Sequence, residues 1–372
     1  MGQKKNSHIY SQKSNNIIQF FEPYISNTLI GSNSILDIER IIDFFPPYLT
    51  NYLGFECRLD NNGIVNSDQG ISLGVSSRKS DRSKFYEFLN SNNLPISRND
   101  QHRWDSITSL VYSWQDNKSP LFYKSHGFWL EFDVPLNKKR ISLPSIFFGP
   151  VNISNRNGTD EQEFSWLITD IISRLNGKDI SNELKSNIMN SLKYIPNNVS
   201  IFQIGMMLSR SDKGVRFVFK GLKENDLFNF LKNQNYIHNV ENQIKIFSEL
   251  FTLVSRINVT LDITPMGIGS IVGMEASYSQ NNFQNEIRWK RVLDYLVNIG
   301  QCSVIKRDAL LRYLGLDMVN CNSKNYHEKQ ISKAYVRFIG HIKLVFEGDQ
   351  ILKTKAYLGL KNFDIPLNLH YQ

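Results

Sequence analysis

The feature that most constrains this 372-residue chain is a recurring order of two helical segments followed by two short alternating segments. Runs that alternate between apolar and polar residues predict strands, and turn formers between two such runs predict antiparallel β-hairpins. Apolar residues three or four apart predict amphipathic helices. We divide the chain into five such units, covering residues 15–78, 79–152, 160–222, 223–280 and 285–360. This order predicts an α+β fold of five α-α-β-β repeats.

Each predicted hairpin has one apolar and one polar face, because successive strand side chains point to opposite sides of a sheet. In residues 55–60, for example, Phe, Cys and Leu alternate with Glu, Arg and Asp. The amphipathic helices can cover the apolar faces. We expect the ten antiparallel strands to close into a β-barrel surrounded by helices, with a wet chamber lined by the polar faces. The alternative is an open sheet with helices on one face and solvent on the other.

Length and composition are compatible with one large domain. We expect residues 1–14 to form a flexible N-terminal tail and residues 15–372 to form a single barrel domain. The chain contains no apolar run of about 18 residues, so no membrane-spanning helix is expected. Its three cysteines form no paired-cysteine motif, which argues against a disulfide framework or a zinc site and favours a cytoplasmic location.

The net charge of +8, from 43 Lys and Arg against 35 Asp and Glu, favours an anionic ligand. These basic residues are scattered, and no run of Lys and Arg exceeds three, so nucleic-acid binding is not predicted. The common nucleotide-binding, zinc-protease and serine-hydrolase motifs are absent. One candidate phosphate site lies in the last hairpin, where strand alternation places Lys353, Lys355 and Tyr357 on one face.

Five α-α-β-β units around a ten-stranded barrel resemble the ABBA (PT-barrel) prenyltransferases. Lys355-Ala356-Tyr357 resembles the Lys-x-Tyr strands with which indole prenyltransferases bind diphosphate and shield the allylic cation. Arg216–Lys220 is similar to another such strand, but has Phe or Val where the family has an inward Tyr. Glu56 matches the acid that hydrogen-bonds the indole nitrogen. The chain departs from the family where Glu275 places a carboxylate at the position of a diphosphate contact.

The resemblance implies a transferase that moves a prenyl group from an allylic diphosphate to an aromatic or peptide-borne acceptor, as in natural-product biosynthesis or peptide modification. Glu56 would orient the nucleophile or take its proton, and Trp129 and Tyr357 would face the cation. Glu131 and His341 are further catalytic candidates. Substrate and diphosphate binding would fall to the inward cations and to these rings: Arg58, Trp129, Arg216, Lys220, Lys343, Lys353, Lys355 and Tyr357.

Two alternatives remain open from the sequence. The barrel could modify or cleave a peptide with its inward acids and use no prenyl donor, or it could bind a peptide without chemistry. For every inward charged residue, the simpler interpretation is an ion pair inside the barrel. Magnesium is the one candidate cofactor, because carboxylates together with a diphosphate suit this ion; no metal site is predicted from the chain's own residues.

Overall fold

The computed structural model describes most of the chain. The described residues are 15–50, 52–60, 69–74, 79–91, 96–134, 142–151, 153, 161–210, 214–278, 287–321 and 331–366. The predicted tail (residues 1–14) and the predicted turn at Asn61–Gly63 lie outside these ranges.

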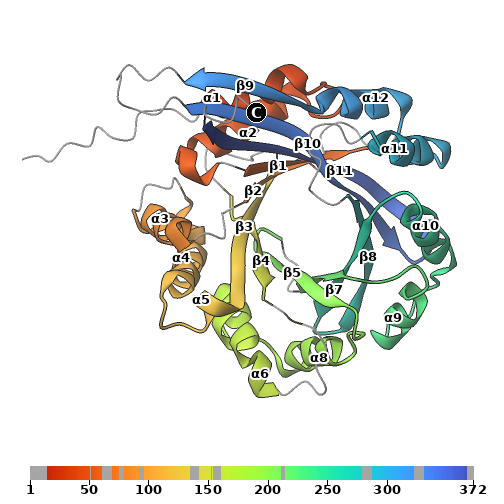
Figure 1. Cartoon of the computed structure of the whole chain (residues 1–372). Coiled ribbons are helices and arrows are strands. Elements are labelled where there is room, and N and C mark those ends of the chain that lie inside the picture. Colours follow the sequence, from red (N-terminus) through yellow and green to blue (C-terminus); the bar gives the residue numbers. More distant parts are fainter. Residues whose placement is uncertain are drawn as a thin grey trace, which may run out of the picture.

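A curled antiparallel sheet forms the centre of the molecule (Figure 1). Its ten main strands are β1 (Tyr52–Arg58), β2 (Gln69–Gly74), β3 (Ser125–Val134), β4 (Ser145–Pro150), β5 (Ser200–Met207), β6 (Val215–Lys220), β7 (Arg256–Thr264), β8 (Gly267–Ser277), β10 (Ile331–Glu347) and β11 (Gln350–Pro366). Each strand from β1 to β7 pairs with the next, β8 pairs with β10, and β10 pairs with β11. The other edge of β11 pairs with β1.

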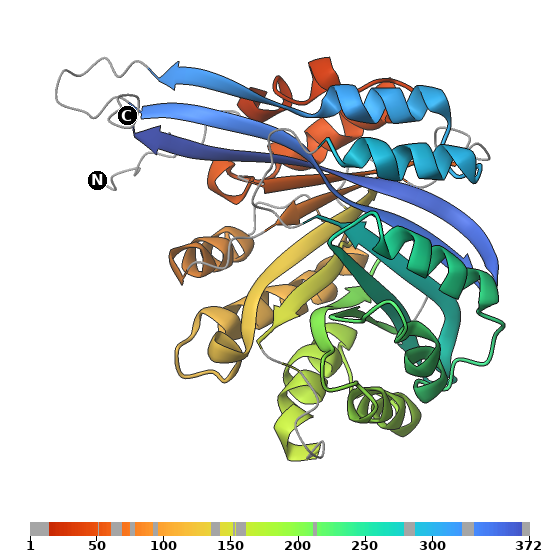
Figure 2. The ribbon, with the colours of Figure 1, turned by 45° about the vertical axis from the view of Figure 1, so that its right-hand side comes forward.

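Helices surround the convex side of this sheet, as Figures 1 and 2 show from two directions. They are α1 (Asn15–Ile18), α2 (Ser32–Asp43), α3 (Lys79–Asn90), α4 (Gln101–Gln115), α5 (Leu121–Lys124), α6 (Glu161–Trp166), α7 (Arg174–Asn176), α8 (Asn182–Lys193), α9 (Leu227–Asn233), α10 (Glu241–Phe251), α11 (Trp289–Asn298) and α12 (Val304–Tyr313). A π-helical segment, Leu167–Ser173, joins α6 to α7. None of the helices in the described ranges is both long and apolar enough to span a bilayer.

The helices form where the sequence predicts amphipathic segments. In α2, Ile35, Ile38 and Ile42 are spaced three and four residues apart and are all buried. At the start of α8, the Ser181 hydroxyl accepts a hydrogen bond from the backbone N–H of Leu184, which satisfies one of the free donors of the first turn. These helices therefore present apolar stripes to the sheet.

The strands present the complementary apolar face. In β3, Phe128, Leu130 and Phe132 are at most 1% exposed, whereas Trp129 and Glu131 between them are only partly buried. In β1 and β7 both faces are buried, but the apolar set is at most 1% exposed, whereas Glu56 and Asp262 on the opposite face are each 8% exposed. The predicted α+β class, and the antiparallel sheet with its apolar face under helices, are confirmed. Barrel closure and the division into five repeats stay predictions.

One strand was missed by sequence reasoning. Beyond the ten expected strands, Gly315–Cys321 forms β9. This strand pairs with the first half of β10, beyond the point where β8 ends along the same edge. Met318 and Val319 are 46% and 38% exposed, so β9 depends on backbone pairing more than on a buried apolar face. Strands of this kind lack the alternation by which strands are predicted.

Candidate active site

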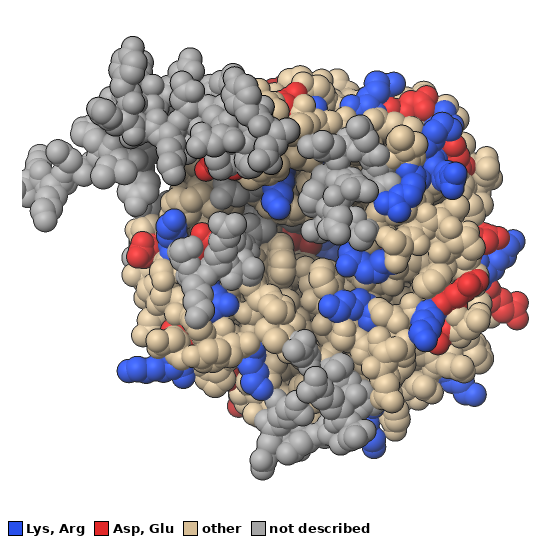
Figure 3. All heavy atoms as spheres, viewed as in Figure 1, with Lys and Arg blue, Asp and Glu red and all other residues tan. Residues whose placement is uncertain are grey.

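The concave side of the sheet, opposite the helices, carries the polar set of strand residues and is called the inner face below. Figure 3 shows Lys and Arg side chains around a hollow near the middle of the molecule, with acidic side chains inside it. Charges on strands that are not neighbours influence one another across this face. Lys343 of β10 lowers the pKa of Glu131 on β3, and the negative charge of Glu131 favours the charged form of Arg216 on β6. The polar residues of the curled sheet therefore converge.

Glu56 is held by two short hydrogen bonds from β11. The Lys355 Nζ atom donates to its Oε1 at 2.6 Å, and the Tyr357 hydroxyl donates to its Oε2 at 2.5 Å. The register explains this contact, because Glu56 lies directly opposite Tyr357 in the β1–β11 ladder. Burial, reinforced by the charge of Glu56, raises the pKa of Tyr357 well above its ordinary value, so the phenol stays protonated and donates.

His341 lies beside this cluster. Its ring stacks on Tyr357 with 4.1 Å between the ring centres and 19° between the planes. Burial disfavours the imidazolium form and lowers the pKa of His341, although the charge of Glu275 acts in the opposite direction. The imidazole is therefore neutral near neutral pH. Its role as a general base stays a prediction.

Three more predicted diphosphate ligands are paired with acids. Arg216 on β6 makes two hydrogen bonds of 2.7 Å to Asp262 on β7, and Lys343 on β10 donates to Glu275 on β8 at 3.0 Å. Arg58 contacts Asp60, two residues along, at 2.9 Å. Burial opposes the charge of Arg216, but the hydrogen bonds and charge of Asp262 outweigh it and raise the pKa of the guanidinium. Together with Lys355, four of the predicted cations thus face a carboxylate.

Glu131 differs from these acids. Within the described ranges, no residue makes a hydrogen bond or an ion pair with its carboxylate. The side chain is partly buried. Burial and the like charge of Glu56 raise the pKa of Glu131 to about 7, while Lys355, Arg210 and Lys343 act to lower it. The inner face thus holds one carboxyl group that changes its charge near neutral pH.

A second cluster lies at one rim of the inner face. A cavity of about 430 Å³ is lined by His126, Trp129, Gly149, Pro150, Asn197, Asn198, Val199, Ser200, Ile201, Phe202 and Lys220. The Lys220 Nζ atom is 5.8 Å from the centre of the Phe202 ring, and the Arg256 guanidinium carbon is 5.6 Å from it. Arg256 Nε donates to Ser277 Oγ at 3.1 Å. In the part of the chain that the structure describes, neither cation has an acidic partner.

Aromatic rings on the inner face fit against glycines. A Cβ atom on Gly205 would lie 2.3 Å from the Phe147 ring, which no real structure tolerates, and one on Gly149 would lie 3.3 Å from the Trp129 ring. Phe147 and Trp129 lie opposite each other in the β3–β4 ladder. Phe147 is contributed by β4 and Trp129 by β3. The arrangement gives the inner face an apolar aromatic wall beside the rim cavity.

Sequence reasoning found most of these residues and missed some. Lys353 lies on the same side of β11 as Lys355, opposite Val345 of β10, as the alternation predicts. Arg256 is not among the residues expected from the sequence, although Arg256, Asn258 and Thr260 follow the period of two of β7. Phe202 was missed because a bulge between Ile201 and Gln203 interrupts the alternation of β5. The catalytic and binding roles of all these residues stay predictions.

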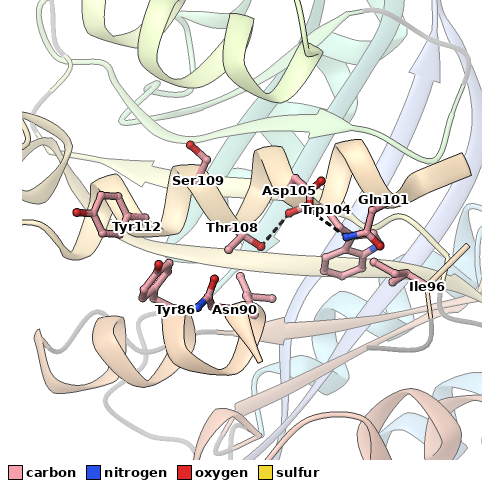
Figure 4. Close-up of a pocket in the computed structure, with 10 residues that line it drawn as sticks. Tyr86, Asn90, Ile96, Gln101, Trp104, Asp105, Thr108, Ser109 and Tyr112 are labelled. Carbon is pink, nitrogen blue, oxygen red and sulfur yellow. Dashed lines mark hydrogen bonds between the residues drawn. The ribbon is translucent and has the colours of Figure 1, made fainter. Parts of the chain in front are cut away.

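A larger pocket lies elsewhere, between α3 and α4 on the outside of the sheet (Figure 4). Tyr86 and Asn90 of α3 face Trp104 and Thr108 of α4 across it. Among the described residues that line it, Asp105 is the one acid and accepts a hydrogen bond from Gln101 at 2.9 Å, and none is a cation. This pocket lacks the charged groups that an anionic substrate needs, so size alone does not make it the active site.

The carboxylates of the inner face do not gather into a metal site. Among the described residues, no group of three or more His, Cys, Asp or Glu side chains is placed to hold an ion. Glu56, Asp262 and Glu275 are each engaged by a cation on a neighbouring strand. The residues present therefore do not fit a magnesium ion held by the protein alone.

Comparison with known proteins gives a likeness in structure but not in sequence. No model of a known protein family matches the chain, and no curated protein sequence matches it. The crystal structure of the prenyltransferase PriB in its apo form is similar, with a TM-score of 0.53 and 10% identical residues. The likeness covers 93% of this chain and 93% of that chain. It shows that the chain has an ABBA-type prenyltransferase fold.

Buried and exposed ion pairs should differ in their contribution to stability. Replacing Glu56 by Ala leaves the Lys355 ammonium group buried without a partner, so we expect a loss of about 3 kcal/mol in the free energy of unfolding. Asp133→Ala is the matched control, because Asp133 and Arg210 are each 48% exposed, and it should cost less than about 1 kcal/mol. Urea unfolding measures both. Equal losses would show that Glu56 is not buried as described.

The raised pKa of Glu131 makes a prediction about stability and pH. Its folded-state pKa of about 7 exceeds the ordinary 4.5, so the native state holds the proton more tightly than the unfolded chain. The contribution of Glu131 to stability is therefore most favourable below pH 4.5 and falls as pH rises towards 7. The free energy of unfolding of Glu131→Gln, relative to that of the native chain, should therefore increase by about 2 kcal/mol as the pH rises from 5 to 8. A difference between the two proteins that is independent of pH would contradict the raised pKa.

Proposed function

We propose that the protein transfers a prenyl group from an allylic diphosphate to an aromatic or peptide-borne acceptor on the inner face. The observation that carries the proposal is the likeness to a prenyltransferase over 93% of both chains, combined with a polar, aromatic-lined inner face. We propose further that the curled sheet closes as a ten-stranded barrel of five repeats. The pairing of β11 with both β10 and β1 supports closure. The inner face is then a chamber.

The diphosphate is best accommodated at the rim, between Lys220 and Arg256. These cations have no acidic partner in the described ranges, whereas Arg216 and Lys343 are each engaged by a carboxylate. Negative charge grows on the leaving diphosphate as the allylic C–O bond breaks, and two nearby cations stabilise it. The other predicted diphosphate ligands are Arg58, Lys353 and Lys355. In this arrangement they contribute to the net charge of the chamber and do not contact the diphosphate.

The aromatic wall suits the prenyl chain of the donor. Trp129 lines the same cavity as Lys220, so the prenyl chain of a donor held there lies against the indole and Phe147. The π face of an aromatic ring attracts a cation, which stabilises the allylic cation in transit. A wall of aromatic rings also keeps water from the cation, because water would convert it to an alcohol. Tyr357 supplies a further ring on the inner face.

The ion pairs also favour a second candidate function. A chamber in which four predicted cations face acids is close to neutral, and such a surface suits a polar peptide as well as a diphosphate. The barrel then modifies or cleaves a peptide without a prenyl donor, or binds it without chemistry. Binding of a diphosphate distinguishes the first function from these.

A titration of the purified protein with dimethylallyl and geranyl diphosphate, with and without Mg²⁺, tests the proposal. We expect saturable binding of at least one donor, and Lys220→Ala or Arg256→Ala to weaken it about tenfold each, since a lost charge-assisted contact costs about 1.4 kcal/mol. Lys232→Ala, which removes an exposed cation on α9, is the control and should leave the affinity unchanged.

Two outcomes would count against this assignment. Absence of binding under every condition would leave the peptide functions as the better account. Normal binding by both rim variants, with a loss on Arg216→Ala, would place the diphosphate deeper in the chamber.

A further inference from the structure

Prenyl transfer releases a proton, and a group on the inner face has to accept it. When an aromatic carbon attacks the allylic carbon, the C–O bond breaks and the diphosphate leaves with the electron pair. The attacked carbon still carries its hydrogen until a base removes it and the electrons of the C–H bond restore the ring. A carboxylate with a free oxygen lone pair is suited to this step.

Glu56 is poorly placed for the role, although it matches the family's acid. Both of its oxygens are already acceptors, at 2.6 Å from Lys355 and 2.5 Å from Tyr357. A further proton on Glu56 would break one of these contacts and leave the Lys355 ammonium group without its counter-charge. The contacts instead suit Glu56 to fixing the positions of the two β11 side chains.

Glu131 meets the requirement that Glu56 fails. Its carboxylate makes no hydrogen bond or ion pair within the described ranges, so no described residue occupies either oxygen. It lies two residues from Trp129 on the same strand, and alternation puts both side chains on the inner face. Trp129 lines the cavity where the donor is proposed to bind, so an acceptor reacting beside this ring lies next to Glu131.

We propose that Glu131 is the catalytic residue that takes the proton from the acceptor, and that Glu56 is a positioning residue that holds Lys355 and Tyr357. This inference rests on the proposed prenyl transfer. The proton moves from the attacked carbon, or from the hydroxyl or amine of another acceptor, to an Oε atom of Glu131. It then passes to solvent, and the diphosphate departs separately from the rim.

The electrostatic setting of Glu131 suits a base that works near neutral pH. Among the described residues, the titratable groups that interact with it are Glu56 on β1, Arg216 on β6, Lys343 on β10, Lys355 and Tyr357 on β11, and Arg210, which follows β5. Burial and Glu56 together raise the pKa to about 7. A base of this pKa is largely ionised just above neutral pH and holds a proton strongly enough to help remove it.

The test uses the full chain with dimethylallyl diphosphate and three acceptor probes: L-tryptophan, L-tyrosine and the tripeptide Gly-Trp-Gly. Prenylated product and released diphosphate are both measured from pH 5 to 9. We expect kcat of the native chain to rise with pH through about 7. Glu131→Gln should lower kcat by about 10² to 10⁴ and remove this rise, while donor affinity stays unchanged. Glu131→Asp should retain the rise with a smaller loss.

Glu56→Gln is the matched variant. As a positioning residue, Glu56 should affect KM and the size of kcat but keep the rise with pH, shifted below pH 7 because Glu56→Gln removes a negative charge that raises the pKa of Glu131. If Glu56→Gln removes the rise and Glu131→Gln keeps it, the proton acceptor is Glu56 and the inference is wrong. Unchanged kcat and an unchanged profile in Glu131→Gln would also overturn it.

Two further readouts separate failure of the inference from failure of the proposed function. Without an acceptor, hydrolysis of the donor to its alcohol uses water as the nucleophile and should show the same dependence on Glu131. A native chain that neither prenylates nor hydrolyses the donor overturns both proposals. The infrared band of a protonated carboxyl group, assigned by its loss in Glu131→Gln, should titrate near pH 7. Titration near 4.5 overturns the inference alone.

Discussion

The contact on which the inner face depends joins the first strand of the sheet to the last. Glu56 on β1 accepts hydrogen bonds from Lys355 and Tyr357 on β11, side chains about three hundred positions away along the chain. Removing a carboxylate and an ammonium group from water is costly, and the cost is offset only when their geometry satisfies both. This contact holds the N-terminal and C-terminal strands in the register that brings the remaining polar residues together.

The same requirement explains the distribution of charge on the inner face. Cations that point away from solvent are each matched by an acid on a neighbouring strand, as Arg216 is by Asp262 and Lys343 by Glu275. Among the described residues, Lys220 and Arg256 at the rim and Glu131 near the aromatic wall have no such partner. A structural role accounts for the paired groups. The unpaired cations are better explained by the binding of an anionic ligand, and the unpaired carboxyl group by the transfer of a proton.

Sequence reasoning succeeded where local pattern decides the structure. Alternation places Phe55, Glu56, Trp129 and Glu131 on the correct sides of their strands, because the period of a strand is fixed by the backbone. It could not assign partners: alternation shows that Glu56 points inwards, but not that Lys355 holds its carboxylate. Such pairs follow from register between distant strands. The bulge before Gln203 and the exposed strand β9 leave no local signal, so the rim cluster was found only in part.

The central claim is that the cations of the inner face are neutralised by their neighbours, so that a diphosphate binds at the rim. A crystal structure with the unreactive thiolodiphosphate analogue of dimethylallyl diphosphate tests it most directly. The account predicts diphosphate density between Lys220 and Arg256, with the prenyl chain along Trp129 and the Glu56–Lys355 contact intact. Diphosphate held by Lys343, Lys355 or Arg216, with these side chains turned away from their carboxylates, would contradict it.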